Sequence, residues 1–436
     1  MQRRLARLTG YGPGFTVLHM VADSVFMNDR AAPVRERVSL SRILVAGGIF
    51  FLPFMNLRPD TILFTFSDLL FVLSGAVLLL RGSLPIAPFG SVTPFWILSA
   101  GLLIGGLFFS SFVNDATERW LSVGSQYAFS LLVLPMILAA RSWSNWVTSA
   151  RALVYGVIFM ELAAFGILNY YGWSYEQIRG RFGPDFFTGV GRVSGFIGGA
   201  NLHAAFLCMC LPFVYYLRIA GMMSLPVFLL ALGLIGAGVF YSASATGFGA
   251  LIIVSAAFVA LSRVRISPQF IGVAAAAAAA FVLAGAPLPK AFEKRVAGAL
   301  ESGQIEEAGT YAGRLELIEE SWKLANKSLL LGIGTDQYRQ ESFHKMPVHN
   351  LYLLLWVEGG IFTLIGWLGV IGILGYTGLV MIARRPLDAA LALSVLAVLI
   401  IFSIAAPHMY ARIWIAPALL AVMPAFAMGR PPTTAA

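Results

Sequence analysis

Apolar residues dominate this chain and fall into long blocks that are separated by short polar stretches. A helix that crosses a membrane needs about 20 apolar residues, and most of the blocks reach that length. We therefore predict an all-α polytopic membrane protein with about twelve transmembrane helices. The predicted spans are residues 43–57, 61–80, 93–113, 121–140, 147–169, 197–219, 224–244, 246–263, 268–286, 350–382, 388–407 and 410–428.

The block 350–382 is longer than one crossing requires. Gly359-Gly360 lies inside it, and consecutive glycines favour an interruption of a helix. We expect the chain to break there into a half-buried entry helix and the true crossing.

One long polar interval, residues 287–349, separates the ninth predicted span from the tenth. Its segments Lys290–Leu300 and Gly313–Lys327 have helical character, so we predict a small helical module rather than a linker. Gly332-Ile333-Gly334 and Pro347 interrupt the chain after these helices. The apolar face predicted for the second helix consists of Leu315, Ile318, Trp322 and Ala325.

Arginine and lysine residues in the short loops predict the orientation, because such residues are retained on the cytoplasmic side. Both termini are then cytoplasmic, and the intervals 170–196 and 287–349 lie outside. The basic N-terminal stretch is expected to lie on membrane lipids. The predicted organisation is a basic cytoplasmic tail at 1–42, transmembrane helices one to nine at 43–286, a large external loop with helices at 287–349, helices ten to twelve at 350–428, and a cytoplasmic tail at 429–436.

Composition agrees with a membrane protein and argues against several function classes. Charged residues make up 12% of the chain, about half the roughly 25% of a soluble protein. The net charge of +9 is spread between apolar blocks rather than gathered in one patch, which argues against nucleic acid. The five histidines lack metal-ligand spacing and no glycine loop suits a nucleotide, so we expect no metal and no cofactor. Cys208 and Cys210 point in different directions on a helix and are predicted to be buried thiols.

Ionisable residues near membrane spans are costly and are therefore candidates for function. One cluster comprises Arg179, Arg181 and Arg192, with Asn201 at the start of the next span. A guanidinium at the membrane surface offers a planar fork for phosphate oxygens. An arginine that only anchors a helix end is an equally good interpretation of Arg192. Arg314, at the start of an external helix, is a second candidate, and a solvated surface arginine explains it as well.

A third cluster begins at His349-Asn350, where the external interval ends. Helical spacing places His349, Tyr352 and Trp356 on one face, so these side chains are predicted to line one surface. An imidazole there can accept a proton from a hydroxyl, and an indole beside it offers a platform for a sugar ring. A purely structural histidine is the alternative.

Taken together, these segments resemble the O-antigen ligase and polymerase superfamily of bacterial envelope glycosyltransferases. The resemblance covers roughly residues 190–385. Its most specific part is His349-Asn350, nine residues, Gly360, two residues and Thr363, which is similar to the ligase signature. Many relatives carry Ser-Arg-Gly where this chain has Ser244-Ala245-Thr246-Gly247. The other similar segments are Arg192-Val-Ser-Gly-Phe-Ile-Gly-Gly-Ala-Asn201, Gly313-Arg314-Leu-Glu-Leu-Ile with Trp322, and Leu331-Gly-Ile-Gly334.

The resemblance implies a GT-C-like enzyme in the bacterial inner membrane, with its site facing the periplasm. It implies transfer of a glycan from undecaprenyl-pyrophosphate to an acceptor hydroxyl, with inversion and without a metal ion. His349 would remove the acceptor proton. Arg192, Arg314 and Arg181 would bind the pyrophosphate and stabilise its charge as it leaves. The residues expected to contact the acceptor or the sugar are Asn350, Tyr352 and Trp356.

Three functions remain to be separated. A ligase transfers the glycan to lipid A–core, whereas an O-antigen or exopolysaccharide polymerase transfers it to a carrier-linked repeat. The spacing from His349 to Gly360 and Thr363 favours the ligase. A transporter or flippase would place ionisable groups at the bilayer midplane and show matched half-chain repeats. The predicted spans are almost uncharged apart from Glu161, which favours chemistry at the membrane surface.

Overall fold

The computed structural model describes residues 39–58, 64–139, 142–264, 311–407 and 409–427, with the backbone alone for 311–314. Every regular element in these ranges is a helix, and Phe187 and Val193 form an isolated bridge. The main helices are α3 (Leu40–Phe50), α4 (Phe66–Leu80), α5 (Thr93–Val113), α6 (Thr117–Ala128), α7 (Leu134–Leu138), α8 (Trp143–Tyr170), α9 (Tyr175–Phe182), α10 (Ala200–Ile219), α11 (Leu225–Ser242), α12 (Ala245–Ser262), α16 (Tyr311–Lys327), α17 (Tyr338–Glu341), α18 (Leu351–Met381), α19 (Pro386–Ala405) and α20 (Arg412–Val422).

Eight helical runs in the described residues are long and apolar enough to cross a membrane, and three shorter apolar helices accompany them. The predicted all-α polytopic membrane architecture is confirmed. Each predicted span in these residues corresponds to one of the helices, whereas the span 268–286 and the external helix Lys290–Leu300 lie outside the described residues. The first span is shifted: Ser39 caps α3, and the helix ends at Phe50 before Pro53.

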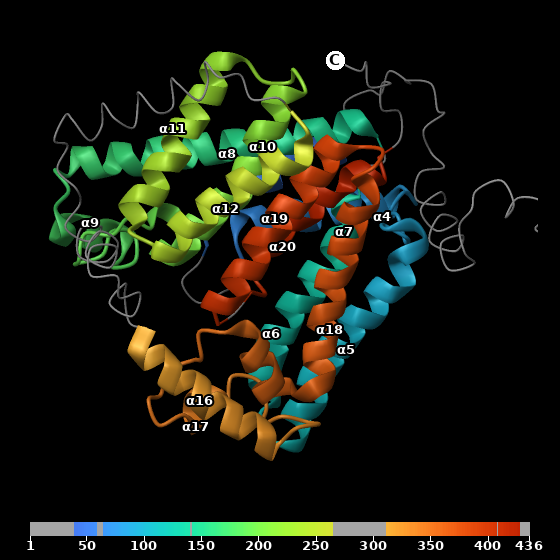
Figure 1. Ribbon diagram of the computed structural model, residues 1–436, viewed down its shortest axis with the longest axis vertical. Helices are drawn as coiled ribbons and strands as arrows, with labels where there is room; N and C mark the ends of the chain where they lie inside the picture. Colours follow the sequence, from blue (N-terminus) through green and yellow to red (C-terminus); the bar gives the residue numbers. More distant parts are fainter. Residues whose placement is uncertain (1–38, 59–63, 140–141, 265–310, 408, 428–436) are drawn as a thin grey trace, which may run out of the picture.

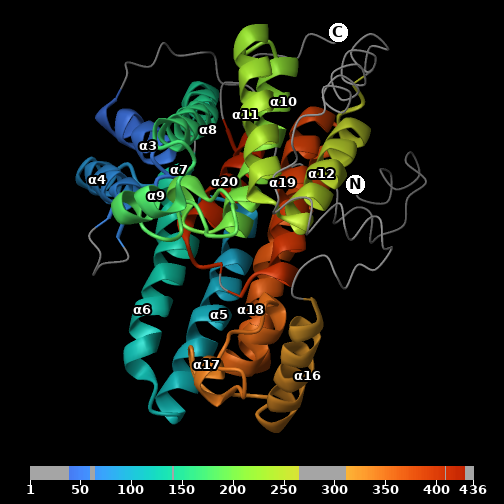
Figure 2. The ribbon, with the colours of Figure 1, turned by 90° about the vertical axis from the view of Figure 1, so that its left-hand side faces the viewer.

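The helices form a bundle from which α5, α6 and α18 extend beyond the others, as Figures 1 and 2 show from two sides. α16 and α17 lie against the extended ends. α5 and α18 form the most extensive helix pair of the described chain. Small residues allow this close approach, because a Cβ added at Gly366 would lie 2.4 Å from the Leu103 nitrogen. α10 runs through the core, where Cys208 and Cys210 are buried free thiols as predicted.

Several connections meet at one end of the bundle, which we call the loop end. It is the end at which α5, α8, α11 and α19 finish. The Asn56 N–H donates to Phe196 O at 3.2 Å, which joins the α3–α4 connection to the α9–α10 loop. The Gly334 N–H donates to Ser110 Oγ at 2.8 Å, which joins the segment before α18 to the end of α5. The connections at the loop end thus meet in two pairs, one at the α9–α10 loop and one at the end of α5.

α18 is interrupted at Gly360, which has φ 75° and ψ −176°. The predicted break at Gly359-Gly360 is confirmed. A Cβ at Gly360 would lie 2.0 Å from Leu330 O, so only glycine fits this approach. Backbone groups freed by the break are satisfied by the preceding loop: Ile333 N–H donates to Val357 O at 2.9 Å, Gly334 N–H to Glu358 O at 3.0 Å, and Ile361 N–H to Leu329 O at 3.1 Å.

The predicted apolar face of α16 is only partly buried: Ala325 and Ile318 pack in the cluster between α16 and α18, but the other two residues do not. Leu315 and Trp322 are 53% and 52% exposed, whereas the buried positions are Leu317, Ser321 and Ala325. The polar Ser321 can lie in this face because its hydroxyl donates to Leu317 O at 2.7 Å within the same helix. The pattern of apolar positions does not reveal such a buried serine, because it counts every serine as a surface residue.

Candidate functional site

Arg192 lies in the loop between α9 and α10, at the loop end. The Thr188 N–H donates to Arg192 O at 2.9 Å, and the Arg192 N–H donates to Thr188 Oγ1 at 3.1 Å. Its side-chain Nε donates to Ser242 O at 2.8 Å, and its Nη2 donates to Asn201 Oδ1 at 2.7 Å. Both of these acceptors are neutral oxygens, and the two contacts fix the orientation of the planar guanidinium.

Two fully buried ionisable residues, Glu161 in α8 and His203 in α10, support this loop from inside the bundle. His203 Nδ1 lies 3.3 Å from Val193 O, and a carbonyl only accepts, so Nδ1 carries a proton. His203 Nε2 lies 2.5 Å from Glu161 Oε1, and the pair has no net charge whichever of them holds the shared proton. Val193 adjoins Arg192, so the pair fixes the backbone that carries the guanidinium.

Arg181, at the end of α9, lines an open cavity of about 480 Å³ at the loop end. Arg58, Asn56 and Asp185 also line it. Two guanidinium groups around one cavity favour an anionic occupant. Arg181 at the end of α9 and Arg192 in the loop that follows it therefore have different surroundings.

His349 is half-buried and directly precedes the first turn of α18. Asn350 caps this helix, because its Oδ1 accepts from the Leu353 N–H at 3.1 Å. The positive end of the α18 dipole therefore lies beside the imidazole. The cap, the histidine and the break at Gly360 all belong to the entry half of one helix.

The two aromatic residues after His349 pack in different directions. Tyr352 packs against the main core of the bundle and interacts with Ser403 in α19. Trp356 packs with the cluster of α16, where its ring meets Trp322 edge-on at 5.2 Å between centroids. The predicted aromatic face is therefore divided between the bundle and the module of α16 and α17.

Residues 227–368, about one third of the chain, match the family model described as O-antigen ligase. They form an O-antigen ligase domain. The resemblance to the ligase and polymerase superfamily is confirmed over these residues, and the match supports a membrane enzyme of the ligase/polymerase type. The match includes His349 and the joint at Gly360, whereas Arg181 and Arg192 precede it. No curated protein matches the chain.

The O-antigen ligase domain contains a buried carboxylate that the sequence analysis did not single out. Glu358 is 3% exposed and accepts hydrogen bonds from the backbone N–H groups of Asp336 and Tyr338. Arg119 Nε lies 2.5 Å from Asp336 Oδ2. Burial and the negative charge of Asp336 raise the pKa of Tyr410. A lone carboxylate in an apolar block is the signal that marks Glu358, but no local signal joins Arg119 to Asp336.

Glu161 is one of several buried carboxylates in the helices, so the expectation that the spans are almost uncharged was wrong. Asp68, Glu358 and Asp388 are buried in helices as well. Asp68 and Asp388 lie in the first turns of α4 and α19, and Glu358 lies just before the break of α18. Asp68 and Asp388 thus lie at the positive ends of their helices, where a carboxylate is stabilised.

The turn that departs from many ligase relatives contacts Arg192. Ser244 caps α12 by accepting from the Gly247 N–H at 3.2 Å. Ser242, two residues earlier, accepts from Arg192. A guanidinium from the α9–α10 loop thus lies at the turn where relatives carry an arginine. Arg314 lies on α16, and its side chain is outside the described residues.

Proposed function

We propose that this protein is an O-antigen ligase that transfers a glycan from undecaprenyl-pyrophosphate to a hydroxyl of lipid A–core. The observation that carries the proposal is His349 at the capped start of α18, inside the O-antigen ligase domain and at the loop end that also holds Arg192. The reaction is inverting and requires no metal, because the pyrophosphate already activates the sugar carbon. The enzyme works in the inner membrane with its loop end in the periplasm.

His349 takes the proton of the acceptor hydroxyl while the hydroxyl oxygen attacks the anomeric carbon. The bond from that carbon to the pyrophosphate oxygen breaks, and negative charge develops on the leaving lipid. Arg192 stabilises this charge, and Arg181 and Arg314 bind the same group more weakly. Asn350, Tyr352 and Trp356 contact the acceptor or the sugar around the start of α18.

The orientation rests on the loops opposite the loop end. These loops carry Arg81, Arg218, Arg263 and Arg384-Arg385, and such residues stay in the cytoplasm. The loop end then faces the periplasm, where carrier-linked glycans meet their acceptors.

His349→Ala tests the proposal most directly. Transfer by the purified variant should fall to background, because the acceptor proton has no base, while the thermal unfolding midpoint stays near that of the wild type. His344→Ala is the matched control, since His344 lies in the same module but pairs with Glu316 at 3.4 Å on its surface. Wild-type transfer by His349→Ala would exclude the base role.

Offering lipid A–core and a carrier-linked repeat in separate reactions decides the acceptor. Transfer to lipid A–core alone supports the ligase. Transfer to the repeat alone supports an O-antigen or exopolysaccharide polymerase that uses the same donor and the same His349.

A further inference from the structure

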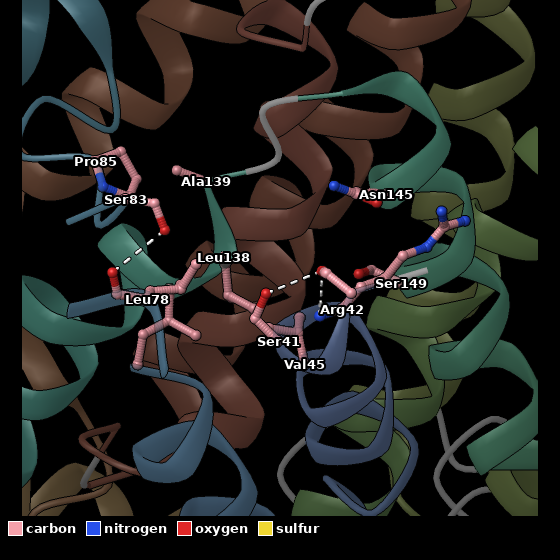
Figure 3. A pocket seen from close by; sticks show the side chains of 12 residues that line it. Ser41, Arg42, Val45, Leu78, Ser83, Pro85, Leu138, Ala139, Asn145 and Ser149 are labelled. Atoms are coloured by element: carbon pink, nitrogen blue, oxygen red, sulfur yellow. Dashed lines mark hydrogen bonds between the residues drawn. The ribbon is translucent and has the colours of Figure 1, made fainter. Parts of the chain in front are cut away.

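A small pocket with a mixed polar and apolar lining lies at the end of the bundle opposite the loop end. It has a volume of about 80 Å³ and lies between the start of α3, the ends of α4 and α7, and the first turns of α8 (Figure 3). One water needs about 10–15 Å³ on this scale, so the pocket accommodates several waters or one group of phosphate size. Its polar lining consists of Ser39, Ser41, Arg42, Ser83, Asn145 and Ser149.

Positive charge and hydrogen-bond donors converge on this pocket. The N-termini of α3 and α8 both lie at it, and each is the positive end of a helix dipole. The Arg42 guanidinium bridges these helices, because Nη2 donates to Ser144 O at 3.1 Å and to Thr148 Oγ1 at 2.5 Å. Both acceptors are neutral, and no described carboxylate lines the pocket. The pocket therefore favours an anion.

Two polar side chains in the pocket lack partners within the described chain. Ser149 is 8% exposed, and its hydroxyl makes no hydrogen bond to the described residues. Asn145 Oδ1 is buried and has no hydrogen-bond partner there either. Buried polar groups are normally satisfied, and an amide presents donors after a half-turn. Ser149 and Asn145 thus supply the polar contacts that an anion in the pocket would complete.

The rest of the lining suits a lipid. Six apolar residues complete the pocket, and Leu40 and Ile43 on α3 expose large side chains beside it. The apolar lining residues are Val45, Leu78, Pro85, Ile137, Leu138 and Ala139. A basic pocket between helix ends on the cytoplasmic side is a known type of site for anionic head groups.

We propose that this pocket binds the phosphate group of an anionic phospholipid from the cytoplasmic leaflet, with the glycerol and acyl carbons on the apolar lining. Arg42 and the two helix N-termini bind the phosphate, and Asn145 and Ser149 donate to its oxygens. The site is independent of glycan transfer, because it lies at the other end of the bundle from His349.

Thermal unfolding of the full-length, delipidated protein in detergent tests this site. Phosphatidylglycerol, phosphatidylcholine and inorganic phosphate are titrated separately. Phosphatidylglycerol should raise the unfolding midpoint of the wild type in a saturable way, and the other two should have at most a tenth of its potency. Equal protection by phosphatidylcholine would mean that head-group charge is not recognised, and equal protection by inorganic phosphate would mean that the ligand is a free anion. Either result contradicts the proposal.

Two variants locate the effect. Arg42→Gln removes the charge, and Ser149→Leu fills the pocket while keeping Arg42. Each should raise the half-maximal concentration of phosphatidylglycerol at least tenfold. Arg151→Gln is the matched control, because Arg151 lies on α8, bonds Met222 O at 2.9 Å and does not line the pocket. An unchanged half-maximal concentration in both pocket variants would overturn the assignment, and so would an equal loss in Arg151→Gln.

Discussion

Arg192 and Arg412 lie at the same end of the bundle, each beside the start of a helix, and their surroundings differ. Arg412 donates through Nε and Nη2 to both carboxylate oxygens of Asp68, and the two side chains are 8% and 1% exposed. Arg192 is partly exposed and donates to Asn201 Oδ1 and to the Ser242 carbonyl. The guanidinium of Arg412 therefore belongs to a buried ion pair, whereas that of Arg192 is oriented by hydrogen bonds to an amide and a carbonyl oxygen.

The contacts of Asp68 explain why Arg412 is a structural residue. Asp68 completes a capping box on α4, because its Oδ2 accepts from the Thr65 N–H at 2.8 Å and from Thr65 Oγ1 at 2.9 Å. The carboxylate joins α4 to the start of α20 through Arg412. Removal of one partner would leave the other charge buried and uncompensated. Arg192, by contrast, is partly exposed.

The largest effect is expected for Asp68→Ala. It leaves the Arg412 guanidinium buried without its carboxylate, which costs about 3–5 kcal/mol. The thermal unfolding midpoint in detergent should fall steeply, or the protein should fail to accumulate. The double variant Asp68→Leu with Arg412→Met should recover most of the loss, because no charge is then buried.

Arg119→Gln is the control for Asp68→Ala. It breaks the ion pair with Asp336, but Arg119 is 59% exposed, and such pairs contribute about 0–1 kcal/mol. A stable Asp68→Ala protein, with a midpoint like that of Arg119→Gln, would show that Arg412 is not a structural residue.

A smaller and different effect is expected for Arg192→Lys. The charge is kept but the bidentate fork is lost, so glycan transfer should fall roughly 10–100-fold, up to the loss seen when one transition-state donor is removed. The unfolding midpoint should change by only about 3 °C, because lysine keeps the charge and Arg192 is partly exposed. A loss of stability as large as the loss of transfer would instead mean that Arg192, like Arg412, is a structural residue.

The sequence predicts the fold better than it predicts this difference between arginines. Apolar blocks of membrane-spanning length locate the described helices, and Gly359-Gly360 locates the break in α18, because both signals are local. The sequence does not reveal that Leu330 O approaches Gly360. It also gives no sign that Asp68 and Arg412, 344 positions apart, form a pair.

The candidate site shows the same limit. The sequence singles out His349 and Asn350 because they end the external interval, and the resemblance to the ligase signature supports that choice. The cap that Asn350 forms on α18 is a local feature of the same segment. The division of Tyr352 and Trp356 between two clusters depends on how α16 packs, which helical periodicity does not report. The support of Arg192 by His203 likewise requires two transmembrane helices to be placed side by side.

The smallest effect on glycan transfer is expected for two substitutions of His203, which test how the backbone beside Arg192 is held. Asn places its amide near the position of Nδ1 and keeps a donor for Val193 O, whereas Gln places its amide near Nε2 and keeps the contact with Glu161. If His203 acts by fixing the backbone beside Arg192, His203→Gln should lower transfer about fivefold, because loss of one hydrogen bond is worth about 1 kcal/mol. His203→Asn should stay within about threefold of the wild type by the same measure.

Combining His203→Gln with Arg192→Lys separates positioning from packing. If His203 acts by positioning the Arg192 guanidinium, His203→Gln should lower the transfer rate very little in the Arg192→Lys background. The losses of the two single variants should therefore not add. Initial rates of transfer for the four proteins of this cycle give the coupling. Equal losses in His203→Asn and His203→Gln that add fully to that of Arg192→Lys would mean that the Glu161–His203 pair only fills the core and does not position Arg192.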